Sequence, residues 1–96
     1  MDVQGLLKEK RQDILRIASK HGVTRIRIFG SAARGESGED SDIDFLIEVN
    51  GPTTPWFPGS LVADLEKLLG RRVDVVEPDA IRRPLRERIL QEAVPL

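Results

Sequence analysis

The sequence predicts an α/β (α+β) fold in which helices pack on a small mixed β-sheet. The main observation is that segments with helically spaced apolar residues alternate along the chain with segments rich in β-branched residues. The length of 96 residues leaves room for one hydrophobic core, so we expect a single domain over residues 1–96. A composition of 40% hydrophobic and 32% charged residues is typical of a globular chain and not of a disordered one.

Helical spacing predicts four helices, and the β-branched segments predict three strands between them. Residues that commonly begin or end helices set the predicted limits. The first predicted helix lies between Asp2 and Gly22, the second covers residues 32–34 and ends at Gly35, and the third lies between Ser60 and Gly70. The fourth begins at Pro84 and has Leu85, Ile89, Leu90 and Ala93 on one face. The predicted strands are residues 23–29, 43–49 and 73–76.

The composition excludes several classes of protein. With 15 Lys and Arg against 16 Asp and Glu, the net charge of −1 argues against a general nucleic-acid coat. The absence of cysteine excludes a disulfide scaffold, and a single histidine argues against a structural zinc site. The apolar runs are too short to span a membrane, and the N-terminus does not resemble a signal peptide. We therefore expect a cytoplasmic protein.

An acidic cluster accompanies the second predicted strand. Six acids and no Lys or Arg lie between Glu36 and Glu48. The simplest interpretation is a solvated loop, but Asp42 and Asp44 lie at the start of an apolar strand, where alternate side chains share a face. Two neighbouring carboxylates repel each other unless a cation lies between them, and oxygen ligands suit Mg²⁺ or Mn²⁺.

A candidate phosphate-binding turn precedes this pair. Gly30 has no Cβ, so its backbone can approach a ligand closely, and Ser31 offers a hydroxyl and a backbone N–H to an anion. Arg34 can add a charged donor. Asp74 lies in a short apolar strand, where it either pairs with Arg71 or Arg72 or joins the other two aspartates as a third carboxylate.

These residues resemble a known family. The stretch from Gly30 to Gly35, followed by Ser41-Asp42-Ile43-Asp44, is similar to the G-S-x-x-R-G…S-D-x-D pattern of the DNA polymerase β-like nucleotidyltransferases, and most closely to the minimal nucleotidyltransferases of prokaryotes. The resemblance implies the nucleotidyltransferase fold, ATP as substrate and two catalytic Mg²⁺ ions, with Mn²⁺ as an alternative. The site residues it implies are Asp42, Asp44 and Asp74 as metal ligands and catalytic residues, with Gly30, Ser31, Arg34 and Ser41 on the nucleotide.

The resemblance also implies a partner. Minimal nucleotidyltransferases are often encoded beside a HEPN-domain toxin and act as antitoxins that transfer AMP from ATP to one of its tyrosines. This sequence contains no tyrosine and has no length for a separate acceptor-binding domain, so we expect the acceptor on a partner chain. A homo- or hetero-oligomer fits that expectation, and neither a membrane nor nucleic acid is expected as the direct target.

Two other functions remain open at this stage. One is a non-catalytic antitoxin that masks its partner, with Trp56 and Phe57 either packed on the sheet or exposed as an interface anchor. The other is nucleotidyl transfer to RNA or to a small molecule. The basic residues Arg82, Arg83, Arg86 and Arg88 fit a solvated helix face better than a phosphate, RNA or acidic-protein contact.

Overall fold

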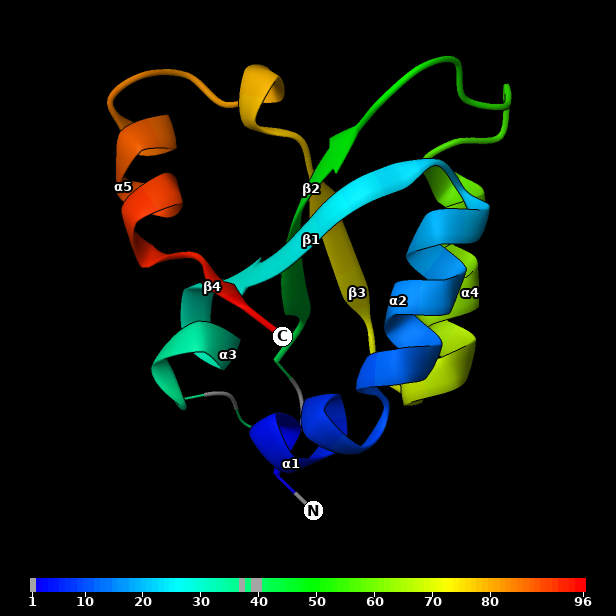
Figure 1. Ribbon diagram of the computed structural model, residues 1–96. Helices are drawn as coiled ribbons and strands as arrows, with labels where there is room; N and C mark the ends of the chain where they lie inside the picture. The colour runs from blue at the N-terminus through cyan, green and yellow to red at the C-terminus, as the bar shows by residue number, and fades with distance from the viewer. Residues whose placement is uncertain (1, 37, 39–40) are drawn as a thin grey trace.

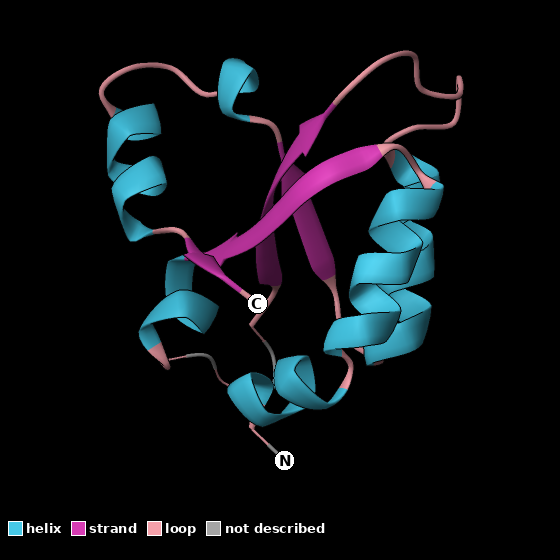
Figure 2. Ribbon diagram, in the orientation of Figure 1, coloured by secondary structure: helices cyan, strands magenta, loops and turns pink. Residues whose placement is uncertain are grey.

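The computed structural model describes residues 2–36, 38 and 41–96, which form a four-stranded mixed sheet with helices around it (Figures 1 and 2). The strand order is β3-β2-β1-β4, with β1 antiparallel to β2 and β4 and with β2 parallel to β3. The elements in chain order are α1 (Val3–Glu9), α2 (Arg11–Lys20), β1 (Val23–Phe29), α3 (Gly30–Arg34), β2 (Ile43–Val49), α4 (Gly59–Leu69), β3 (Val73–Val76), the 3-10 turn η1 (Pro78–Ala80), α5 (Leu85–Glu92) and β4 (Val94–Pro95). The small mixed sheet expected from the sequence is confirmed.

The hydrophobic core lies between the sheet and the helices α2 and α4, which run side by side (Figure 1). Ile14 of α2, Leu61 and Leu65 of α4, and Ile43 and Phe45 of β2 are all completely buried. Burying a side chain of this kind stabilises a fold by about 1.5–3 kcal/mol. This packing fixes β2, and therefore fixes where the residues between its buried side chains point.

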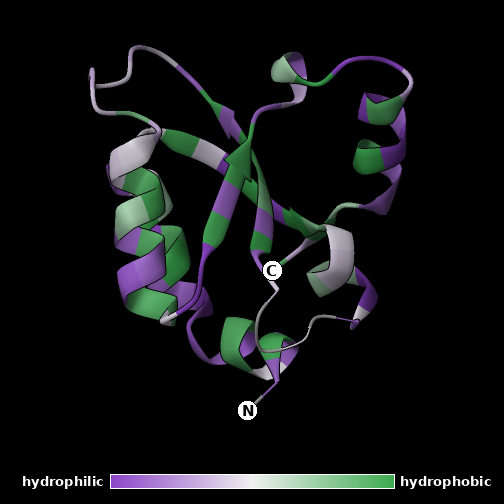
Figure 3. Ribbon diagram, turned by 180° about the vertical axis from the view of Figure 1, so that it is seen from behind, coloured by the Kyte–Doolittle hydropathy of each residue, from purple (hydrophilic) through white to green (hydrophobic). Residues whose placement is uncertain are grey.

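The opposite face of the sheet is more polar. Along β2, the alternation that sends Ile43, Phe45 and Ile47 into the core turns Asp44 to the other face. Hydrophilic and hydrophobic residues alternate along the central strands in the view from behind (Figure 3). Leu46 shares this second face and is buried, and η1 lies against β2. The helices α3 and α5 contact each other on the other side of the molecule from α2 and α4.

The predicted first helix is two helices. Asp2 caps it as expected, since its carboxylate accepts the Gly5 N–H at 2.7 Å, but the helix breaks at Lys10 and α2 begins at Arg11. The buried positions 3, 7, 14 and 18 have the spacing of one continuous helical stripe, so periodicity could not reveal the break.

One other local prediction is wrong, and the structure decides two points that the sequence left open. Ser60 is not an N-cap, because α4 begins at Gly59 and the Ser60 hydroxyl lies 3.4 Å from His21 Nδ1. The last helix has no buried residue, and Leu85 remains 51% exposed. Of the aromatic pair, Trp56 is 78% exposed while Phe57 packs against the core. Within the described residues, no helix is both long and apolar enough to cross a membrane.

Candidate active site

Three strand ends meet at one edge of the sheet and bring the predicted site residues together. Asp44 lies opposite Phe29, the last residue of β1, and opposite Asp74 in the parallel register of β2 and β3. The start of β3 is held by α4, because Glu66 accepts the Val73 N–H at 2.9 Å. Asp44 and Asp74 are therefore neighbours on adjacent strands although thirty residues separate them in the chain.

Gly30 brings the backbone directly against Asp44. Its φ of +69° lies in the left-handed region that favours glycine, and a Cβ built on Gly30 would lie 2.6 Å from Asp44 Oδ2. A real Cβ atom does not tolerate that distance. The sequence predicted that Gly30 lets the backbone approach a ligand closely, and in the structure the group that its backbone approaches is the Asp44 carboxylate.

The carboxylates at this edge affect one another electrostatically. Burial raises the pKa of Asp44, and the negative charges of Asp74 and Asp42 raise this pKa further. Arg34 opposes the shift, and Glu92 adds to it. Repulsion of this kind favours a cation among these groups, and carboxylate oxygens are the ligands that Mg²⁺ prefers.

The predicted alternative for Asp74 involved Arg71 and Arg72, and both arginines contact the segment before β2. Arg72 forms an ion pair with Asp42, Nε to Oδ1, at 3.0 Å. Arg71 donates to the Ser41 carbonyl at 3.0 Å and also to the Gly38 carbonyl. These contacts hold the entry to β2, and they turn the Asp42 carboxylate toward Arg72.

A metal ion would therefore require a small rearrangement. No group of three His, Cys, Asp or Glu side chains within the described ranges already surrounds a single metal position. Asp44 and Asp74 are paired in register on neighbouring strands, and Asp42 reaches them electrostatically. The set consists of oxygen donors with a mutual repulsion to be neutralised, which fits a hard divalent cation once Asp42 exchanges Arg72 for it.

Of the residues predicted to bind phosphate, Ser41 and Arg34 make contacts with other parts of the protein. Ser31 follows Gly30 in α3 and is half-buried. The Ser41 hydroxyl accepts the Gly38 N–H at 3.2 Å. Arg34 forms ion pairs with Glu36, with Nε 2.9 Å from Oε2, and with Glu92. The two hydrogen-bonded carboxylates, Glu36 first, raise the pKa of Arg34, so this guanidinium stays charged.

Glu92 is the residue at this edge that sequence reasoning missed. It comes from the last turn of α5, 58 positions after Arg34. The one available signal was its position, because a carboxylate at the C-terminal end of a helix is disfavoured by the helix dipole and needs another stabilising partner.

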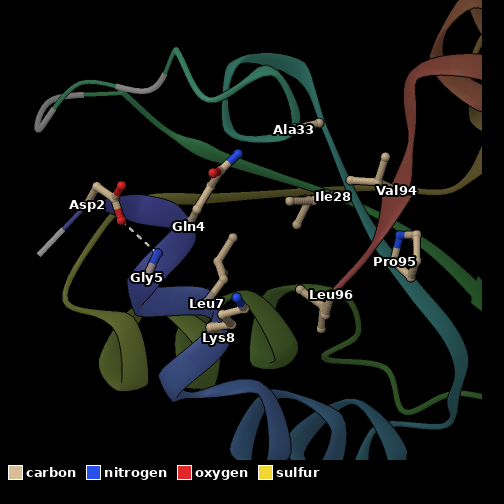
Figure 4. Close-up of a pocket in the computed structure, with 10 residues that line it drawn as sticks. All are labelled: Asp2, Gln4, Gly5, Leu7, Lys8, Ile28, Ala33, Val94, Pro95 and Leu96. Atoms are coloured by element: carbon tan, nitrogen blue, oxygen red, sulfur yellow. Dashed lines mark hydrogen bonds between the residues drawn. The ribbon is translucent and has the colours of Figure 1, made fainter.

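A well-defined cavity lies away from these residues. It measures about 370 Å³ and is formed by α1, the end of β1, α3 and β4 (Figure 4). Residues that line it include Asp2, Gln4, Leu7, Ile28, Ala33 and Leu96. None of the predicted site residues is among them, because Ile28 points to the helix-covered face and Asp44 to the other.

Known proteins with the same sequence pattern and fold now identify the family. The family described as "Nucleotidyltransferase domain" matches residues 8–96. The chain belongs to this family and is an enzyme of the nucleotidyltransferase class.

Its relatives are of similar length. A candidate protein adenylyltransferase of Methanocaldococcus jannaschii, MJ0435, is 43% identical over 88 residues, which cover 92% of this chain and 95% of the relative. The protein adenylyltransferase MntA of Thermococcus cleftensis is 31% identical over 93 residues, which cover 97% of this chain and 91% of the relative.

Solved structures agree. A candidate minimal nucleotidyltransferase has a TM-score of 0.87 and 43% identity, with 100% of this chain and 97% of the other covered. A toxin–antitoxin crystal structure with AMP-PNP has a TM-score of 0.74 at 20% identity, with 88% of this chain and 69% of the other covered, and shares the fold. The predicted membership of the minimal nucleotidyltransferases is confirmed.

Proposed function

We propose that this protein transfers AMP from ATP to a hydroxyl group of a partner toxin, a tyrosine hydroxyl of a HEPN-domain protein, and that this modification makes it an antitoxin. The observation that carries the proposal is the placement of Asp44 beside Asp74 in the sheet and against Gly30. The names of the relatives support it, because several are protein adenylyltransferases and one is MntA. We infer ATP as the donor, in line with the AMP-PNP present in a structure of the same fold.

The reaction is an in-line displacement at the α-phosphorus of ATP. The acceptor oxygen forms a bond to this phosphorus, and the bond from the phosphorus to the pyrophosphate oxygen breaks. Asp74 is exposed at the edge of the site and takes the proton that the acceptor hydroxyl loses. We place Gly30 and Ser31 against the triphosphate, as the resemblance to the family implies, and the absence of a side chain at Gly30 is what lets its backbone lie directly against the Asp44 carboxylate.

Two Mg²⁺ ions, with Mn²⁺ as an alternative, would be held by Asp42, Asp44 and Asp74, and would neutralise the triphosphate charge and activate the acceptor hydroxyl. Without them, the carboxylates would repel a nucleotide that carries negative charge of its own. Burial first, and then the charges of Asp74 and Asp42, raise the pKa of Asp44, so the carboxylates already repel one another without a nucleotide.

The acceptor must come from another chain. The sequence has no tyrosine, and the cavity of about 370 Å³ between α1 and β4 lies away from the carboxylates. We infer that a toxin partner supplies the tyrosine and completes the site. We propose that the reaction takes place in the cytoplasm.

The test is transfer of label from α-labelled ATP to the toxin encoded beside this protein, with Mg²⁺ present. Asp42→Asn and Asp44→Asn should each reduce labelling by at least about a hundredfold, because each removes a charged ligand of the site. Asp79→Asn is the matched control, since Asp79 is exposed in η1 and its change should leave labelling intact. Absence of label on the toxin, or equal labelling by all variants, contradicts the proposal.

A second candidate is an antitoxin that neutralises its partner by covering it. The exposure of Trp56, at 78%, favours this possibility, because large exposed aromatic side chains often anchor interfaces. Full neutralisation of the toxin by the Asp42→Asn, Asp44→Asn double variant would support masking. Loss of neutralisation by that variant with toxin binding retained would support catalysis.

A further inference from the structure

Exposed apolar side chains gather on one segment, which we call the α5 arm and define as residues 82–94. Among the described residues, four large apolar side chains are exposed, and three of them belong to this arm: Leu85 at 51%, Leu90 at 38% and Val94 at 39%. The helix α5 within the arm has no buried residue. Exposed apolar groups that cluster in this way are typical of a surface that another molecule covers.

The same arm carries arginines that the rest of the chain does not neutralise. Residues 82–88 include four arginines and a single acid, Glu87; the arginines are Arg82, Arg83, Arg86 and Arg88. Within the ranges that the structure describes, none of the four is paired with an acid. Positive charges near the N-terminal end of a helix are disfavoured by its dipole, so these arginines do not stabilise α5 itself. Their charge is therefore available to acidic groups of another molecule.

The α5 arm adjoins the catalytic edge. Glu92, the last residue of α5, forms an ion pair with Arg34 of α3, and its charge acts on the Asp44 carboxylate. Trp56, the fourth of the exposed apolar side chains, follows the far end of β2, about 17 Å of strand away from Asp44. The loop between β2 and α4, which contains Trp56, and the helix α5 lie on opposite sides of the molecule (Figure 1). A partner whose acceptor hydroxyl reaches Asp44 and Asp74 can therefore contact the α5 arm at the same time.

We propose that the α5 arm is the docking surface for the acceptor protein, and that this partner meets it with a surface that combines carboxylates with apolar side chains. The inference rests on the proposed function for the identity of the partner, the toxin. Carboxylates of the toxin pair with the guanidinium groups of the arm, whose planar geometry suits two parallel hydrogen bonds to a carboxylate. Apolar side chains of the toxin cover Leu85 and Leu90. This contact holds the acceptor hydroxyl of the toxin beside Asp44 and Asp74.

The composition of the arm favours a protein over RNA. Phosphates of RNA bind arginine, but they offer no apolar contact to Leu85, Leu90 and Val94. The carboxylates of the adjoining catalytic edge repel phosphates, and the net charge of the chain is −1. A protein surface with both carboxylates and apolar side chains matches both features of the arm.

The experiment measures binding of the purified toxin to the full chain without nucleotide, at about 0.1 M and at about 1 M NaCl. We expect the double variant Arg82→Glu, Arg83→Glu to weaken toxin binding at least about tenfold at the lower salt concentration, mainly through slower association. This difference should shrink at the higher salt concentration, because salt screens the charges. Leu85→Ala should weaken binding about threefold at both salt concentrations, mainly through faster dissociation, because it removes apolar contact.

The labelling assay separates docking from chemistry. The Arg82→Glu, Arg83→Glu variant should have a higher KM for the toxin, with the KM for ATP and the kcat at saturating toxin unchanged. A role of these arginines in the chemical step would lower kcat instead.

The matched control is the double variant Arg16→Glu, Lys67→Glu, which changes the net charge by the same amount at exposed positions of α2 and α4. These helices cover the other face of the sheet, so toxin affinity should stay within about twofold of wild type. Thermal unfolding shows whether each variant is folded.

The inference is overturned if the toxin does not bind, or if the arm variant and the control variant bind it equally well. In the second case, weaker binding of a single-stranded RNA by the arm variant alone would assign the arginines to RNA. Toxin binding that depends on the arm, without labelling of the toxin, supports the docking surface and contradicts the proposed reaction. Labelling that does not depend on the arm contradicts the docking surface alone.

Discussion

At the scale of single residues, the absence of a Cβ atom at Gly30 matters both for the backbone conformation and for the geometry of the candidate site. Its φ is positive, and a side chain there would collide with the Asp44 carboxylate at 2.6 Å. We expect Gly30→Ala to displace Asp44 and to abolish nucleotidyl transfer. We also expect it to lower the free energy of unfolding by about 1 kcal/mol or more, because alanine is strained at this φ.

Gly70 provides a matched control for this change. Its φ of +66° is nearly the same, but nothing lies within 4 Å of the Cβ that an alanine would add. Gly70→Ala should therefore destabilise the protein by a similar backbone cost and keep its activity. Urea unfolding and the labelling assay measure the two effects separately. If both variants retained activity, the contact between Gly30 and Asp44 would have no catalytic importance.

At the scale of elements, the end of α2 is joined to the start of α4 by polar side chains. His21 Nε2 lies 2.7 Å from Asp64 Oδ2, and Ser60 approaches the other ring nitrogen. The hydrogen bond to His21 lowers the pKa of Asp64. A carboxyl group with a lowered pKa in the folded state stabilises the fold above its unfolded pKa, and this contribution is lost as the pH falls through the folded value.

Asp64→Asn should therefore be less stable than wild type at about pH 6, and the difference should be smaller at about pH 2.5, on the acid side of the ordinary aspartate pKa. Urea unfolding at the two pH values measures this. The control is Asp13→Asn, which removes a surface ion pair with Arg16 on α2 and should change stability little. If Asp64→Asn were less stable than wild type by the same amount at low pH, packing and not the charged hydrogen bond would hold the two helices together.

Elements also show how far the sequence could predict this structure. The strands 23–29, 43–49 and 73–76 have the predicted limits, because residues that alternate between a buried and an exposed face leave a periodic pattern. The two-residue strand β4 leaves no such pattern, since it exists only through its pairing with β1. The break at Lys10 interrupts a stripe that would suit one helix equally well.

The same distinction applies to the candidate site. Gly30, Asp42 and Asp44 are close in the chain, and local spacing predicted their association. Asp74 required an assumption about strand order, and the parallel pairing of β2 and β3 satisfies it. Glu92 could not be predicted, because only the tertiary packing of α5 against α3 brings it to Arg34.

At the scale of the whole molecule, a well-packed core supports an electrostatically unfavourable edge. The Cα radius of gyration of 12.7 Å is close to the value of about 12.5 Å expected for a chain of this length. The core packs on one face of the sheet, while Asp42, Asp44, Asp74 and Glu92 gather at an edge beside the other. The stability gained in the core offsets the repulsion among these carboxylates.

This repulsion predicts that Asp44, which we propose as a catalytic residue, destabilises the protein when no cation is bound. The pKa of Asp44 is raised in the folded state, so the folded protein binds more protons and loses stability as the pH rises from the unfolded pKa to the raised value. Asp44→Asn should therefore unfold about 2–4 °C above wild type at pH 7 without Mg²⁺, a small shift because solvent screens this partly exposed group. Below the unfolded pKa of about 3.9, the two proteins should have the same Tm.

Addition of Mg²⁺ should raise the Tm of the wild type and reduce the difference, because a bound cation neutralises the carboxylates and stabilises the state that binds it. Thermal scans at two pH values, with Mg²⁺ and with EDTA, measure all three effects. If Asp44→Asn were less stable than wild type at pH 7, the Asp44 charge would stabilise the fold. These carboxylates would then not be a cation site in which repulsion destabilises the protein until a cation binds.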